Sequence, residues 1–231
     1  MKQLALELST APPPSLDNFE PAGNTLLWAT LQAGLSQLSA GASPQPLLLW
    51  GASGAGKTHL LQGLQAWGDD RAWPWAVLHA ASDADLALDF DPAWRLLLMD
   101  DVDLWSAPIQ ARAFQWLAST QGHVQRPWVV ATASTPPTDW TAMRADVSSR
   151  LAQGLVLEIQ LLDEAARLGV LRREAEARGL HLSDEVASFM LRRFSRDLGS
   201  LMALLAHVDD YAMRSQRALT VPLLKSMLEN E

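Results

Sequence analysis

The chain has 231 residues, of which 48% are hydrophobic, with a formal net charge of −8 at pH 7 and no cysteine. This length suits one large α/β domain with a small companion, and the composition excludes disulfides, thiolate chemistry and extensive disorder. The acidic balance argues against a surface held to duplex DNA by phosphate neutralisation. Because no signal-peptide core or membrane-length apolar run occurs, we expect a cytoplasmic protein without membrane contacts.

The chain opens with a tail, residues 1–14, that ends in the three prolines Pro12, Pro13 and Pro14. Proline removes backbone donors and favours an extended spacer, so we expect the tail to lie outside the folded core. The first helix is predicted after this spacer from leucines at helical spacing. These leucines are Leu27, Leu31, Leu35 and Leu38.

Continuous apolar runs then alternate with helical stretches. The runs predict five strands, at 47–50, 76–78, 96–99, 128–131 and 155–159. Helices such as 57–67 and 109–119 are predicted between them. This alternation is typical of a parallel sheet with helices on both faces, so we predict an α/β domain with a five-stranded parallel sheet over residues 15–161.

The pattern after residue 161 is helical only. It predicts one helix over 163–178 that is stopped by Gly179, one capped by Ser183, a long one through 198–212 and a last one capped by Thr220. We therefore predict a small all-helical domain over residues 162–231.

The strongest motif follows the first predicted strand and opens a helix. It consists of Gly51, Ala52, Ser53, Gly54, Ala55, Gly56, Lys57 and Thr58, which matches G-x-x-x-x-G-K-[ST]. Such a loop turns backbone amides toward a β-phosphate, while Lys57 can reach phosphate oxygens and Thr58 can ligate Mg²⁺. A serine nucleophile elbow, G-x-S-x-G, is disfavoured because Ala55 occupies its last glycine position. We predict that the loop binds ADP or ATP with Mg²⁺.

Two carboxylates, Asp100 and Asp101, end the predicted strand at 96–99. Asp100 is expected to hold Mg²⁺ directly or through water, and Asp101 to orient or deprotonate the attacking water. The alternative is that both acids simply begin a solvated loop. An aspartate reaches less far than the glutamate that most enzymes of this kind carry, so we expect weak intrinsic turnover.

The two motifs, together with segments 130–137, 147–151 and 194–198, resemble the DnaA-like AAA+ family of bacterial replication proteins. The resemblance covers about residues 15–229 and implies a P-loop AAA+ domain followed by a helical lid. The chain is most similar to family members that inactivate the initiator DnaA and end soon after the lid. The initiator's DNA-binding domain is therefore not expected here.

The resemblance also implies roles for four further residues. Arg150 would be an arginine finger presented to a nucleotide in a neighbouring subunit, and Arg196 a lid sensor of bound nucleotide. Ser134 occupies the position of an acidic or amide sensor, with Thr132 as the other candidate. The alternatives are a surface arginine in a solvated loop for Arg150 and a lid salt bridge for Arg196.

The tail residues Gln3, Leu4, Leu6 and Leu8 are similar to the short peptide with which this family grips the sliding clamp, the β subunit of DNA polymerase III. The implied partners are DnaA and the clamp, with DNA contacted indirectly through the clamp, while homo-oligomer formation stays open. The implied function is regulation of replication initiation, in which Arg150 stimulates hydrolysis of DnaA-bound ATP and leaves the inactive ADP form. Two alternatives remain: a self-contained AAA+ ATPase that loads or remodels a helicase on single-stranded DNA, and a nucleotide-dependent adaptor.

Overall fold

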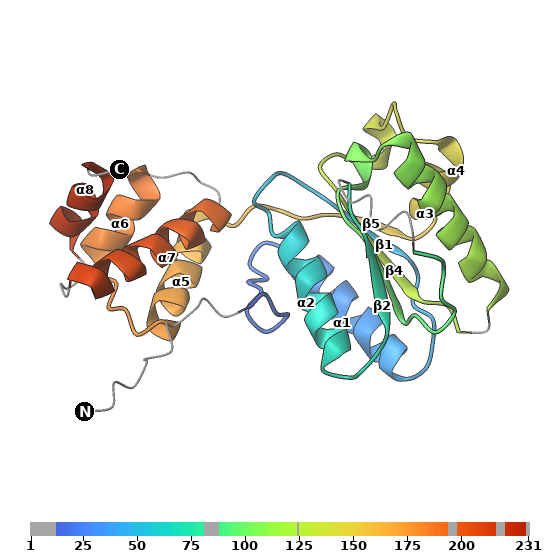
Figure 1. Cartoon of the computed structure of the whole chain (residues 1–231), viewed down its shortest axis with the longest axis horizontal. Helices are drawn as coiled ribbons and strands as arrows, with labels where there is room; N and C mark the ends of the chain where they lie inside the picture. Colours follow the sequence, from blue (N-terminus) through green and yellow to red (C-terminus); the bar gives the residue numbers. More distant parts are fainter. Residues whose placement is uncertain (1–12, 81–87, 124, 194–197, 216–219, 230–231) are drawn as a thin grey trace. The chain divides into compact units, whose positions relative to one another are not determined.

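The computed structural model describes residues 13–80, 88–123, 125–193, 198–215 and 220–229 (Figure 1). The chain divides into two compact units, one spanning Pro14–Leu161 and the other including Leu162–Glu231. Among the described residues, no helix is long and apolar enough to cross a membrane.

The first unit is built on a five-stranded sheet in which every pairing is parallel and the strand order is β2-β3-β4-β1-β5. The strands are β1 (Leu47–Trp50), β2 (Trp75–Leu78), β3 (Leu96–Met99), β4 (Trp128–Ala133) and β5 (Leu155–Glu158). The predicted parallel five-stranded sheet is therefore confirmed. Only the ends differ, since β2 begins at Trp75, β4 continues to Ala133 and β5 stops at Glu158.

Helices cover both faces of this sheet, as predicted. The helices α1 (Thr25–Ser39) and α2 (Lys57–Asp69) lie on one face, and α3 (Ala107–Ser119) and α4 (Ala145–Leu151) lie on the other (Figure 1). In the described part of this unit, short 3₁₀ turns lie in the connections: η2 (Val102–Leu104), η3 (Thr120–Gly122) and η4 (Pro137–Asp139).

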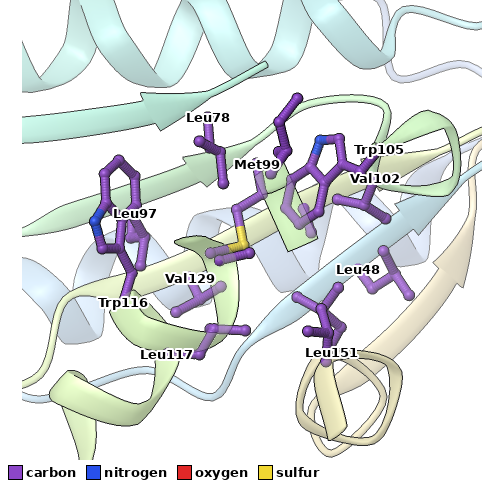
Figure 2. Packing of buried hydrophobic residues seen from close by; sticks show 14 of the residues in the cluster. Leu48, Leu78, Leu97, Met99, Val102, Trp105, Trp116, Leu117, Val129 and Leu151 are labelled. Carbon is purple, nitrogen blue, oxygen red and sulfur yellow. The ribbon is translucent and has the colours of Figure 1, made fainter. Parts of the chain in front are cut away.

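Strand residues alternate between two hydrophobic cores, which explains the continuous apolar runs in the sequence. Leu47 and Leu49 belong to the core under α1 and α2, whereas Leu48 belongs to the core under α3 and α4. Figure 2 shows this second core, where Trp116 of α3 and Leu151 of α4 pack toward the sheet. Both cores hold the strands so that their carboxyl ends meet at one edge.

The second unit is a bundle of four helices: α5 (Glu164–Ala177), α6 (Asp184–Arg193), α7 (Leu198–Ser215) and α8 (Val221–Glu229). The predicted caps are confirmed, because the hydroxyl of Ser183 accepts from the amide of Val186 at 3.3 Å and that of Thr220 from Leu223 at 3.4 Å. Gly179 has φ +72°, the left-handed conformation expected just after a helix.

Candidate functional site

The loop between β1 and α2 has the backbone of a phosphate-binding turn. Gly56 has φ +101°, a conformation that glycine adopts without a steric penalty, and α2 begins at the next residue, Lys57. A Cβ at Gly51 would lie 2.4 Å from the carbonyl oxygen of Ile159, so the start of the loop also requires a glycine. The loop thus leads into the amino end of a 13-residue helix, whose first amides lack partners within the helix and could bind an anion.

The ammonium group of Lys57 is buried, and its described hydrogen bonds are to neutral groups. Lys57 is 7% exposed, and its Nζ donates to the carbonyl oxygens of Gly51 at 2.7 Å and Ala52 at 3.1 Å. Among the described residues, no carboxylate forms an ion pair with it. An ammonium buried without a counter-ion is costly, and a phosphate of a nucleotide would supply the missing negative charge.

The two predicted metal ligands lie together at the carboxyl end of the sheet. The hydroxyl of Thr58 donates to Oδ2 of Asp100 at 3.4 Å, and Asp100 is 8% exposed. No group of three or more metal-binding side chains occurs in the part of the chain that the structure describes. One carboxylate and one hydroxyl nevertheless fit Mg²⁺, which keeps several waters and takes further oxygens from a nucleotide. A cavity of about 220 Å³ opens beside these two residues and has room for such a ligand shell.

Thr132 connects both acids, whereas Ser134 does not. The hydroxyl of Thr132 donates to Oδ1 of Asp100 at 2.5 Å and accepts from the amide of Asp101 at 3.0 Å, and its side chain is fully buried. The side chain of Ser134 is exposed, and its backbone amide donates to Asp103 at 3.0 Å. Of the two sensor candidates, Thr132 is the one in contact with Asp100, the predicted metal ligand.

Asp101 lies in the left-handed region at φ +47°, ψ +52°, which is uncommon for a residue other than glycine. Burial raises the pKa of its carboxyl above the ordinary value, the neighbouring charges of Asp100 and Asp103 raise it further, and the charge of Lys57 opposes them. A carboxylate with a raised pKa is a stronger base than an ordinary aspartate. The position and the pKa therefore suit a group that orients or deprotonates water.

Arg150 lies on a helix, which the sequence did not predict. It belongs to α4, and its guanidinium lies 5.3 Å from the ring centroid of Phe114 on α3. Among the described residues, Arg150 makes no ion pair with a carboxylate. The described hydrogen bonds of Asp100 are to Thr58 and Thr132, and none joins it to Arg150. The cation therefore keeps its capacity to bind an anion.

Several predicted residues lie outside the described part of the chain. These are Gln3, Leu4, Leu6 and Leu8 of the tail and Arg196 of the lid. The phosphate loop, Asp100, Asp101 and Thr132 come together, while Arg150 is placed elsewhere, beside Phe114.

Two residues that sequence reasoning missed shape the loop after β3. The indole Nε1 of Trp105 donates to the carbonyl oxygen of Asp100 at 3.0 Å, and Oδ2 of Asp103 accepts from Ser134 and from the hydroxyl of Thr135 at 3.4 Å. The sequence shows that Asp103 is acidic, but its hydrogen bonds to Ser134 and Thr135, just after β4, depend on the register of the sheet.

A phosphate-loop motif after β1, an acidic pair after β3 and the strand order β2-β3-β4-β1-β5 together are typical of a P-loop AAA+ fold. Domain III of the replication initiator DnaA from Thermotoga maritima has the same fold, with a TM-score of 0.77 at 18% identity over 96% of this chain and 98% of that one. DnaA from Aquifex aeolicus, solved with bound AMPPCP, matches with a TM-score of 0.70 at 21% identity over 88% of this chain and 68% of that one. The RuvB branch migration motor of Thermotoga maritima matches with a TM-score of 0.68 at 18% identity, over 94% and 72% of the two chains.

The sequence of the second unit gives a more specific similarity. Residues 163–228 match the family described as "Hda, lid domain". The chain therefore combines the fold of the DnaA AAA+ domain with a second unit that is similar in sequence to the Hda lid. An uncharacterized protein of Haemophilus influenzae is 29% identical over 98% of both chains.

Proposed function

We propose that this chain is a regulator of bacterial replication initiation that stimulates hydrolysis of ATP bound by DnaA and so converts the initiator to its inactive ADP form. The observation that carries the proposal is the combination of an Hda-type lid with a DnaA-like AAA+ fold in one chain. Docking on the DNA-loaded sliding clamp through Gln3, Leu4, Leu6 and Leu8 completes the proposal.

The first part of the proposal is that the chain itself binds a nucleotide. The phosphate loop, the buried Lys57 and the pair Thr58 and Asp100 have the chemistry to hold ADP or ATP, and Mg²⁺ would supply charge neutralisation between the phosphate oxygens and these ligands. Binding of AMPPCP by the DnaA of Aquifex aeolicus, whose fold is shared, is consistent with this assignment. Arg196 would contact the nucleotide from the lid.

The activating group is Arg150. Its guanidinium makes no described ion pair, and no described contact takes it into the chain's own phosphate site. A planar cation placed at a neighbouring γ-phosphate stabilises the charge that develops during transfer, an effect worth about 10³–10⁵ in rate. The chemistry then occurs mainly in the partner's site, and the intrinsic ATPase of this chain is weak or absent.

The proposal is tested by incubating DnaA that carries labelled ATP with DNA-loaded clamp and this protein, and following conversion to ADP. Hydrolysis should accelerate only when all three proteins are present. If this chain instead hydrolyses ATP on its own when single-stranded DNA is added, it is a self-contained ATPase. If the nucleotide on DnaA is unchanged although both proteins bind the clamp, it is an adaptor without hydrolytic effect.

A further inference from the structure

Gln110 is a buried polar side chain that joins two loops. It lies on α3, is 5% exposed, and its Nε2 donates to the carbonyl oxygens of Trp105 at 2.9 Å and Ala142 at 3.3 Å. Its Oε1 accepts from the backbone amide of Arg144 at 2.8 Å. All three partners are backbone groups, and the contacts to Ala142 and Arg144 bridge 32 and 34 residues of sequence.

These partners connect the metal-binding loop to the helix that carries Arg150. On one side, Trp105 is fixed to the carbonyl oxygen of Asp100 through its indole. On the other side, Arg144 is the residue before α4, and its carbonyl oxygen accepts from Val147 at 3.1 Å and Ser148 at 2.9 Å. Gln110 therefore holds the amino end of α4 at a fixed place relative to the end of β3.

Phe114, one helical turn after Gln110, contacts the guanidinium of Arg150. The Cζ atoms of Arg144 and Arg150 lie 5.2 and 5.3 Å from the centroid of its ring, within the range of a cation–π interaction. Arg144 is neutralised by a two-point contact with Asp146 at 2.7 and 3.1 Å. Arg150 has no such carboxylate among the described residues, so the aromatic ring is its main described contact.

A helix as short as α4 does not fix its own position. It has seven residues, and isolated helices of that length are unstable in water, so its direction depends on the groups that hold its ends and faces. An apolar side chain at position 110 would leave three backbone groups without the partner that Gln110 provides. A fully hydrogen-bonded amide instead adds geometric precision.

We propose that Gln110 and Phe114 are positioning residues that orient Arg150 toward a nucleotide bound by a neighbouring subunit. This inference rests on the proposed function of Arg150 as an arginine finger. Gln110 sets the place of α4 by fixing its amino end, and Phe114 holds the guanidinium through its ring face. Neither residue touches the reacting phosphate.

The test is a set of double-mutant cycles in the assay with ATP-loaded DnaA and DNA-loaded clamp. Gln110→Met and Phe114→Leu should each lower the maximal stimulated rate about tenfold, because small misplacements of a catalytic group are costly. The concentration of this protein that gives half-maximal stimulation should stay within about twofold, since docking is unchanged. Combined with Arg150→Ala, neither substitution should lower the rate further.

Two further variants separate positioning from general damage. Phe114→Tyr keeps the ring face and should retain the stimulated rate, whereas Phe90→Leu removes another half-buried aromatic from the same core and should leave the rate unchanged. If Gln110→Met fails to fold, the double-mutant cycle of Phe114→Leu with Arg150→Ala tests the positioning role. Losses that persist in the Arg150→Ala background, or a normal rate for Phe114→Leu, would overturn the inference. A silent Arg150→Ala variant would instead refute the proposed function.

Discussion

Replacing Thr132 by valine should destabilise the first unit, because the buried hydroxyl of Thr132 satisfies two polar groups. It donates to Oδ1 of Asp100 at 2.5 Å and accepts from the amide of Asp101 at 3.0 Å. A hydrogen bond to a carboxylate contributes about 1.5–3 kcal/mol and one to a neutral amide about 1 kcal/mol. Valine has nearly the same shape, so cavity formation adds little, and we expect a loss of about 2–4 kcal/mol in the free energy of unfolding.

Urea unfolding followed by tryptophan fluorescence reports on the first unit of the chain, because all 10 tryptophans lie between residues 28 and 140. With a urea dependence of about 2–3 kcal/mol per M, the midpoint should fall by about 1 M. Thr132→Ser keeps the hydroxyl and should lose much less. Ser134→Ala is the matched control at an exposed position and should change stability by less than about 0.5 kcal/mol. Equal midpoints for Thr132→Val and Ser134→Ala would show that the Thr132 hydroxyl does not stabilise the fold.

Three other predictions follow from the site and the tail. Lys57→Ala should weaken binding of both ADP and ATP in calorimetry, and unchanged affinity for both would remove the phosphate-loop assignment. The pKa of Asp101 is raised in the folded state, so the protonated carboxyl stabilises the fold at low pH and this stabilisation is lost as the pH rises through the raised pKa. The stability of Asp101→Asn relative to the wild type should therefore be higher at pH 7 than at pH 4. A difference in urea midpoint that does not change with pH would contradict this. Deletion of residues 1–10 should leave the urea midpoint unchanged and abolish retention on immobilised clamp, and a truncated protein that still binds would place docking elsewhere.

The elements that sequence reasoning located are those whose signal is local. Strands β1, β3 and β4 are buried on both faces, so their apolar runs are continuous, and the phosphate loop is a contiguous motif with its own glycine requirement. The caps at Ser183 and Thr220 likewise need only the next turn of helix. These features could be read from the sequence because their causes lie within a few residues.

The features that it did not locate depend on contacts between distant segments. The choice between Thr132 and Ser134 follows from strand register, in which Met99 pairs with Ala131 and the next residues on both strands therefore meet. Helix α4 is too short to have a clear periodic pattern, and its position depends on Gln110, more than thirty residues earlier. No single-sequence pattern encodes such pairings.

The Arg150→Ala variant shows whether Arg150 acts on a nucleotide held by a neighbour. Folding, nucleotide affinity and clamp binding should be preserved, while stimulated hydrolysis by ATP-loaded DnaA on DNA-loaded clamp should fall by about 10² or more. Arg150→Lys should recover little of the rate, because an ammonium lacks the planar fork of the guanidinium. An alanine variant that stimulates DnaA normally, or that first loses its own nucleotide, would contradict the account.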